Sequence, residues 1–195
     1  MNDKTKTLVG IGLFTAIVIV LQALSISIRF GIFTVTLVLI PIVVGAALYG
    51  WKAGAWLGFV FSVVVLITDA GAFLAVNVPG TVITVLLKGT MAGLVAGMIY
   101  LKLSAKNRYL AVVVAAVSAP IVNTGIFLIG CRLFFYATIG EWAAAAGFAS
   151  AGLYMIVGFV GLNFIVETVI NVALIPVIFR LINLGRRSNV RSVTA

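Results

Sequence analysis

GLNFIVETVINVALIP, residues 161–176, lies inside a long apolar run and carries three polar side chains. Asn163, Glu167 and Asn171 are spaced i, i+4 and i+8, so a helix places all three along one stripe. A carboxylate in the middle of such a segment is costly to bury, and it normally faces a protein interior or a wet cavity. Two interpretations are open. The asparagines hold neighbouring helices together and Glu167 is a structural ion-pair partner, or the stripe binds a polar solute.

The composition of the whole chain is that of a membrane protein. Of the 195 residues, 64% are hydrophobic and only 9% are charged, and the mean hydropathy is +1.31. We therefore expect one all-α membrane domain over residues 1–195. The chain has no histidine and a single cysteine, Cys131. This inventory predicts no disulfide, no metal site, no cofactor and no catalytic centre.

Six apolar segments predict six transmembrane helices. The second is short and contains Pro41, which favours a kink or a re-entrant segment. Residues 27–36 alternate in the manner of extended backbone and are expected to form an outer loop. Trp142 and the alanines after it predict a short interfacial helix in the longest outer loop, 132–152. The predicted spans are about 8–27, 37–49, 53–68, 81–101, 109–131 and 153–179.

The basic residues set the orientation of these spans. Six spans place both termini on one side of the membrane, and ten basic residues lie on that side. The opposite loops hold two, Arg29 and Arg132, and Lys88 lies within a span. This asymmetry predicts cytoplasmic termini, and it explains the net charge of +9 without a nucleic-acid partner. The ten are Lys4, Lys6, Lys52, Lys102, Lys106, Arg108, Arg180, Arg186, Arg187 and Arg191.

Polar groups from three predicted helices fall at similar depth in the outer half of the membrane. Lys88 lies about 10–14 Å below the outer end of its span, Asn123 about 12 Å and Asn163 about 15 Å, and Glu167 is one turn deeper. Lys88 either snorkels to the interface or pairs with Glu167, which lowers the cost of burying both charges. Such a pair is structural, or it docks a zwitterionic or anionic solute. The candidate binding residues are Lys88, Asn123, Asn163, Glu167 and Asn171.

Small residues mark two helix faces. Gly12 and Ala16 form a small-xxx-small pattern in the first span, which indicates either internal packing or a partner surface. Gly89, Gly93 and Gly97 repeat every four residues in the fourth span. We expect this glycine ladder to form a groove for a neighbouring helix.

Taken together, these features resemble the substrate-binding S components of energy-coupling factor (ECF) vitamin transporters. The resemblance covers most of the chain, and it includes TVTLVLIPIVVGAALYGWKAGAWLGFVFSVV at residues 34–64. Within that family, PIVNTGIFLIGCRLFF at residues 120–135 and the helix with Asn163 and Glu167 look most like pantothenate-type members. The resemblance implies a transporter subunit rather than an enzyme.

The resemblance also implies partners. An S component in the plasma membrane of a prokaryote captures a B-type vitamin from outside; pantothenate is favoured here, and riboflavin, folate and pyridoxine are open. A transmembrane coupling subunit and two ATPase subunits then drive delivery inward, and this chain has no phosphate-binding loop of its own. By resemblance, the loops at 29–35 and 69–79 gate the site, and Gly12 and Ala16 face the coupling subunit.

Two other classes of protein are alternatives to this resemblance. A self-sufficient small secondary transporter or channel is the first alternative, but the chain is small and shows no inverted repeat. A purely structural membrane protein is the second alternative. Placing Lys88 and Glu167 inside the membrane is costly, and a structural protein does not need either charge there.

Overall fold

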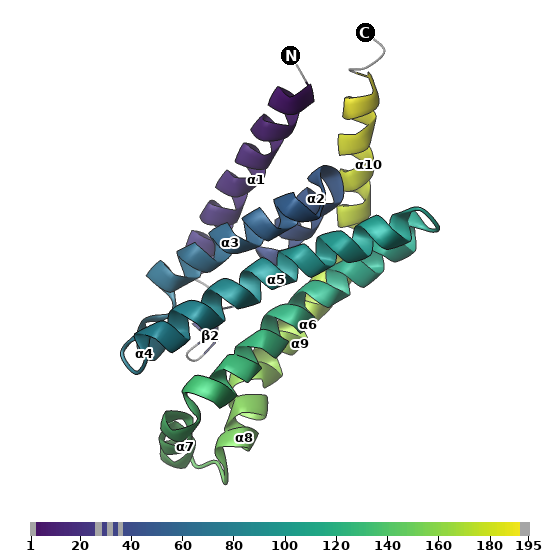
Figure 1. Ribbon diagram of the computed structural model, residues 1–195. Coiled ribbons are helices and arrows are strands. Elements are labelled where there is room, and N and C mark those ends of the chain that lie inside the picture. Colours follow the sequence, from purple (N-terminus) through teal and green to yellow (C-terminus); the bar gives the residue numbers. More distant parts are fainter. Residues whose placement is uncertain (1–2, 26–28, 31–32, 35–36, 192–195) are drawn as a thin grey trace.

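The computed structural model describes residues 3–25, 29–30, 33–34 and 37–191. Within these ranges the chain consists of helices joined by short turns, with one antiparallel pair of two-residue strands, in which Arg29 pairs with Thr34. The short helices α4, α7 and α8 lie at one end of the molecule, and the start of α1 and the end of α10 lie at the other (Figure 1). The elements are α1 (Asp3–Ser25), β1 (Arg29–Phe30), β2 (Phe33–Thr34), α2 (Leu39–Tyr49), α3 (Trp51–Thr68), α4 (Gly71–Leu74), α5 (Val78–Ser104), α6 (Arg108–Phe134), α7 (Tyr136–Ala145), α8 (Ala151–Leu153), the π-helix η1 (Tyr154–Gly161), α9 (Leu162–Ala173) and α10 (Ile175–Arg191).

Four helices of the described chain, α1, α3, α5 and α6, are long and apolar enough to cross a bilayer. The α9–α10 pair meets the same requirement jointly but is bent by 52°, so the number rises to five if the pair is one span. α2 has 11 residues and covers about 16 Å, roughly half of a hydrocarbon core of about 30 Å. The all-α membrane architecture is therefore shown, and six crossings with cytoplasmic termini remain a prediction.

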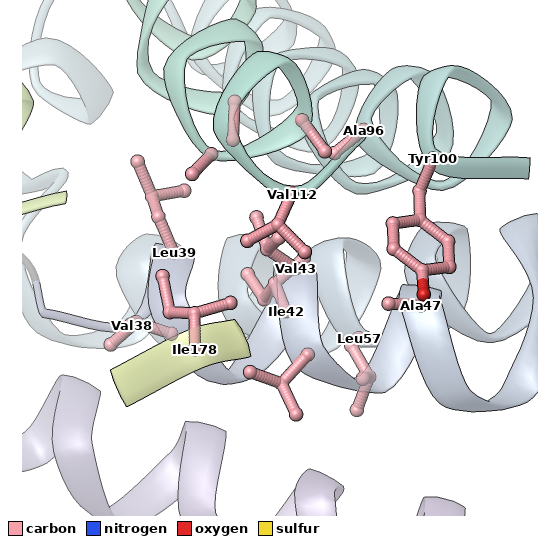
Figure 2. Packing of buried hydrophobic residues seen from close by; sticks show 14 of the residues in the cluster. Val38, Leu39, Ile42, Val43, Ala47, Leu57, Ala96, Tyr100, Val112 and Ile178 are labelled. Atoms are coloured by element: carbon pink, nitrogen blue, oxygen red, sulfur yellow. The ribbon is translucent and has the colours of Figure 1, made fainter. Parts of the chain in front are cut away.

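α2 is an interior helix. Positions 41–47 are all buried, and Figure 2 shows Val43 close to Val112 of α6, with Ile178 of α10 nearby. A helix that is apolar on every face is stable when other elements surround it. Pro41 lies in the first turn, where a backbone N–H has no intrahelical partner. Pro41 is therefore compatible with the start of this helix, and the helix runs unbroken from Leu39 to Tyr49.

α3 and α5 touch through their backbones. A methyl group at Gly58 would overlap the carbonyl of Gly89, and one at Gly54 would overlap the carbonyl of Gly93. A methyl group at Gly97, one turn further along α5, would lie 2.6 Å from the Cα of the first residue of α3. The predicted glycine ladder is therefore confirmed as a groove, and the helix that it receives is α3.

The predicted span 153–179 is wrong as a single helix. It consists of a short α8, the π-helix η1, then α9, and then α10 after a bend. Pro176 has no backbone N–H, and its ring would meet the carbonyl of Val172 in a continuous helix, so α9 ends at Ala173. Asn163, Glu167 and Asn171 all fall within α9 at the predicted spacing, so their backbone positions share one side of the helix.

Two predicted outer loops contain helix. A helical turn, α4, lies within 69–79, and α5 begins at Val78 rather than near residue 81. Asn77 caps α5 by accepting a hydrogen bond from the N–H of Gly80 at 2.9 Å, and Pro79 fits the first turn. In 132–152, α7 includes Trp142, where a short helix was expected, but it begins earlier, at residue 136. Much of the predicted gate at 29–35 and the end of the first span at 26–27 lie outside the described residues.

The close contact of α3 and α5 predicts that Gly58→Ala destabilises the protein. The added methyl group meets the Gly89 carbonyl, and the helices must separate at a cost of about 1–3 kcal/mol. Gly12→Ala is the matched control, because nothing lies within 4 Å of that position and alanine is the better helix former. Thermal unfolding in detergent should show a lower midpoint for Gly58→Ala only. Equal midpoints for the two variants would show that the backbone contact is not required.

Candidate functional site

Polar side chains from α5, α6 and α9 lie inside the bundle. Lys88 comes from α5, Asn123 from α6, and Glu167 and Asn171 from α9; α6 packs against both α5 and α9. Asn123, Glu167 and Asn171 are 7%, 4% and 1% exposed, and Lys88 is half-buried. Asn163 lies one turn before Glu167 in α9, but its side chain is outside the described part of the structure.

Lys88 reaches from α5 to α6. Its Nζ atom lies 5.2 Å from the centroid of the Phe127 ring, which is a cation–π contact. The charges of Glu167 in α9 and of Asp69 at the end of α3 also act on this ammonium group. Snorkelling requires the side chain to extend along its own helix to the membrane interface. In the structure, Lys88 instead contacts the Phe127 ring of another helix.

Four aromatic rings form a cluster beside Lys88, which we call the aromatic roof. Phe73 of α4 is at its centre and makes edge-to-face contacts with Phe127, with Phe135 and with Trp142 of α7. The ring centroids lie 5.6, 5.1 and 5.6 Å from that of Phe73. Because Phe127 also contacts Lys88, the roof links the cation to α4 and α7, which lie at one end of the molecule (Figure 1).

The aromatic roof was not predicted from the sequence. Phe73 lies in a segment that the sequence indicated to be a loop, and Phe127 is one of thirteen phenylalanines in an apolar chain. One usable signal was present, since each predicted outer segment after span 3 contains aromatic residues. That signal says nothing of which rings meet, because contacts between segments far apart in sequence depend on the packing of the helices.

The amide groups of the site are only partly satisfied. Asn171 Nδ2 donates to the backbone carbonyl of Glu167 at 2.8 Å, which holds the amide in one orientation. Asn171 Oδ1 and Asn123 Oδ1 have no hydrogen-bond partner, and neither does the hydroxyl of Thr168, which the sequence analysis did not single out. Buried polar groups are normally paired. These three groups therefore require an explanation.

The side chains of the site are suited to charge and hydrogen-bond recognition. The Lys88 ammonium group donates only, a Glu167 carboxylate would accept only, and each asparagine can do both. Among residues 3–25, 29–30, 33–34 and 37–191, no group of three or more His, Cys, Asp and Glu side chains is placed to hold a metal ion. Cys131 is buried and forms no disulfide.

Gly12 and Ala16 lie on an open face of α1. Both residues are exposed, and nothing lies within 4 Å of a methyl group placed at Gly12. α1 is attached to the bundle by its other side, where Val18 is buried and the Thr15 hydroxyl accepts a hydrogen bond from Trp56 Nε1 at 3.1 Å. In the described chain, therefore, the small-residue face is not used for internal packing.

The central position of Phe73 predicts that Phe73→Ala opens the aromatic roof. Trp142 loses its contact with Phe73, so its indole becomes more exposed to water. The measurement is the emission wavelength of Trp142 and its quenching by acrylamide, in a background in which Trp51 and Trp56 are phenylalanine. We expect a red shift and stronger quenching.

The matched control for this experiment is Phe148→Ala, because Phe148 contacts Tyr154 rather than the roof. It should leave the Trp142 spectrum unchanged. An unchanged spectrum in Phe73→Ala would show that the roof stays closed without its central ring.

Comparison with known proteins gives a family. The family model described as "ECF transporter, substrate-specific component" matches residues 6–179, which is most of the chain. No curated protein and no solved structure matches the chain.

Proposed function

The chain belongs to the family of substrate-specific components of ECF transporters, and from this premise we propose that it captures a B-type vitamin from outside the cell, with pantothenate as the favoured solute. Riboflavin, folate and pyridoxine are the other solutes to be compared. The vitamin is then delivered inward together with a transmembrane coupling subunit and two ATPase subunits. The host membrane is the plasma membrane of a prokaryote, and both termini face its cytoplasm.

The observation that carries this proposal is the position of Lys88. Ionisable side chains within a membrane segment are rare because they are costly, and they commonly mark the path or site of a polar solute. Lys88 lies inside the bundle against Phe127, within the influence of Glu167 and Asp69. In our proposed orientation the aromatic roof lies on the outer side of this cation. A carboxylate that passes the roof would meet Lys88 before the deeper polar groups.

Pantothenate offers groups that match this site. It has one carboxylate, one amide and two hydroxyls. In our proposal Lys88 binds the carboxylate as a point cation. Asn123 and Asn163 pair with the amide and the hydroxyls. Glu167 accepts from a hydroxyl or holds Lys88 in place, and Asn171 extends the same stripe.

The role of Lys88 predicts a charge-selective loss of affinity in Lys88→Met. Loss of a charge-assisted contact in a dry site costs about 1.5–3 kcal/mol, or roughly 10- to 150-fold in Kd. Titration calorimetry should show this loss for pantothenate and a much smaller one for the neutral vitamin pyridoxine. Lys88→Arg, which keeps the charge, should restore most of the affinity. Unchanged pantothenate binding in Lys88→Met would remove the main argument for an anionic solute.

A change at Asp69 is expected to raise the affinity for pantothenate, in contrast to Lys88→Met. Its carboxylate competes with an incoming anion for Lys88, so Asp69→Asn should strengthen pantothenate binding. Asp69 is only partly buried, so we expect a gain of at most about fivefold, as for a partly exposed ion pair of about 0.2–1 kcal/mol. Weaker binding in Asp69→Asn would indicate that Asp69 orients the cation instead of competing for it.

The open face of α1 predicts a variant that separates binding from transport. In Gly12→Leu the added side chain points away from the bundle, so the vitamin Kd should stay the same. A coupling helix that packs closely on Gly12 and Ala16 can no longer approach, so ATP-dependent uptake should be lost. Val20→Leu, at another exposed position of α1, is the matched control and should transport normally. Loss of vitamin binding in Gly12→Leu would place this face inside the binding unit instead.

The same reconstitution distinguishes a subunit from a self-sufficient transporter. Vesicles that contain this chain alone, without ATP, should bind the vitamin and accumulate none. Vesicles that also contain the coupling subunit and the ATPases should accumulate it when ATP is supplied. Accumulation by the chain alone would favour the secondary-transporter alternative.

A further inference from the structure

The hydroxyl of Thr168 lacks the hydrogen bond that three other helical threonines make. Threonine within a helix usually donates to the carbonyl four residues before it. Thr15, Thr68 and Thr81 do so, at 2.8, 2.8 and 2.7 Å. Thr168 Oγ1 is buried and has no partner.

Two other unpaired hydroxyls have a structural explanation. Ser62 Oγ lies where a methyl group on Gly89 would be, and Thr84 Oγ1 has the same relation to Gly130. Both oxygens therefore lie against the Cα–H of a glycine at a close helix crossing, which is a weak but recurrent contact. At none of the described glycines is Thr168 among the three nearest neighbours of an added methyl group.

The unpaired oxygens of Asn123 and Asn171 belong with Thr168. Asn123 and Asn171 are buried on α6 and α9, two helices that pack together. Asn171 Nδ2 already donates to the Glu167 carbonyl, so the oxygen of that amide is fixed as an unpaired acceptor. Thr168 is three residues before Asn171 and shares its side of α9. An unmade hydrogen bond at a buried group is costly, so a site that retains three of them is built for a solute with donors.

These oxygens lie deeper than the cation. Asn123 is one helical turn, about 6 Å, from Phe127 toward the start of α6, and Asn171 is one turn from Glu167 toward the end of α9. Figure 1 shows α6 and α9 running in opposite directions, so both steps lead away from α4, α7 and the aromatic roof. The order from the roof inward is therefore Phe127 and then Asn123 along α6, and Glu167, Thr168 and then Asn171 along α9.

We propose that Asn123, Thr168 and Asn171 form a donor-reading face, and that the solute binds with its anionic end at Lys88 and its hydroxyl groups inward at this face. The proposal rests on the proposed function and adds to it a direction of binding and a new contact residue, Thr168. It also states which solutes are excluded: an anion without hydrogen-bond donors leaves the deep oxygens unpaired and binds weakly.

The test crosses three variants with three compounds. The first compound is pantothenate. The second is panthenol, in which an alcohol replaces the carboxylate. The third is N-(3,3-dimethylbutanoyl)-β-alanine, the deoxy compound, which keeps the carboxylate but lacks both hydroxyls. Thr168→Val and Asn171→Leu should each weaken pantothenate and panthenol by roughly fivefold or more and leave the deoxy compound almost unchanged. Lys88→Met should weaken pantothenate and the deoxy compound and spare panthenol. A uniform loss across all compounds, or no loss in either α9 variant, would overturn the proposal.

A second measurement separates recognition from a structural role and needs no ligand. Replacement of an unpaired buried hydroxyl by an isosteric methyl group removes a cost. The melting midpoint of ligand-free Thr168→Val should therefore equal or exceed that of the wild type. Thr15→Val, which loses hydrogen bonds to Ile11 and Trp56, is the matched control and should melt lower. A midpoint of Thr168→Val as low as that of Thr15→Val would show that its hydroxyl stabilises the fold, and the proposal fails.

The two measurements keep this proposal apart from the proposed function. If the wild type binds pantothenate but the α9 variants keep full affinity, the vitamin assignment stands and the donor-reading face is wrong. If the wild type binds no pantothenate, the vitamin assignment fails. The melting comparison then tests the donor-reading face without a ligand. A midpoint of Thr168→Val as low as that of Thr15→Val would contradict it.

Discussion

The backbone contact between α3 and α5 determines much of what the rest of the structure can do. At the two glycine pairs, Gly58 with Gly89 and Gly54 with Gly93, no side chain separates the helices. This contact fixes the rotation of α5 about its own axis. Lys88 immediately precedes Gly89, and successive residues on a helix point about 100° apart. When the Gly89 side of α5 faces α3, Lys88 is turned away from α3, toward Phe127 of α6.

The interior of the molecule is organised around a helix too short to span a bilayer. α2 is buried along almost its whole length, and α5, α6 and α10 contribute to the apolar cluster around it. α1 is the contrasting case, since most of its large apolar side chains are exposed, including Leu8, Leu13 and Val20. In a membrane such a surface meets lipid tails or another apolar helix. At Gly12 this surface has no side chain, and nothing lies within 4 Å of a methyl group placed there.

The polar site illustrates how function departs from stability. A cation among apolar helices, and amide and hydroxyl oxygens without partners, make the ligand-free protein less stable than an apolar core would. The α3–α5 contact and the enclosure of α2 supply rigid packing on which this arrangement is held. Sites where local rules are broken are expected to coincide with binding or catalysis. Here they coincide with the helices that carry Lys88, Asn123 and Asn171.

The sequence by itself determined the all-α membrane class, the glycine groove of α5, the polar stripe of α9 and the family resemblance, because these follow from composition and helical periodicity along one segment. It placed Lys88 and Asn123 inside helices for the same reason. Only the tertiary structure decided that α2 is interior, that the last span breaks before Pro176 with a bend of 52°, and that Phe73 joins α4 to α6 and α7. It also decided that Thr168 lacks a partner while Thr15 has two. Whether a buried oxygen is satisfied depends on which atoms of other helices reach it, and that information is not carried by the periodicity of any single segment.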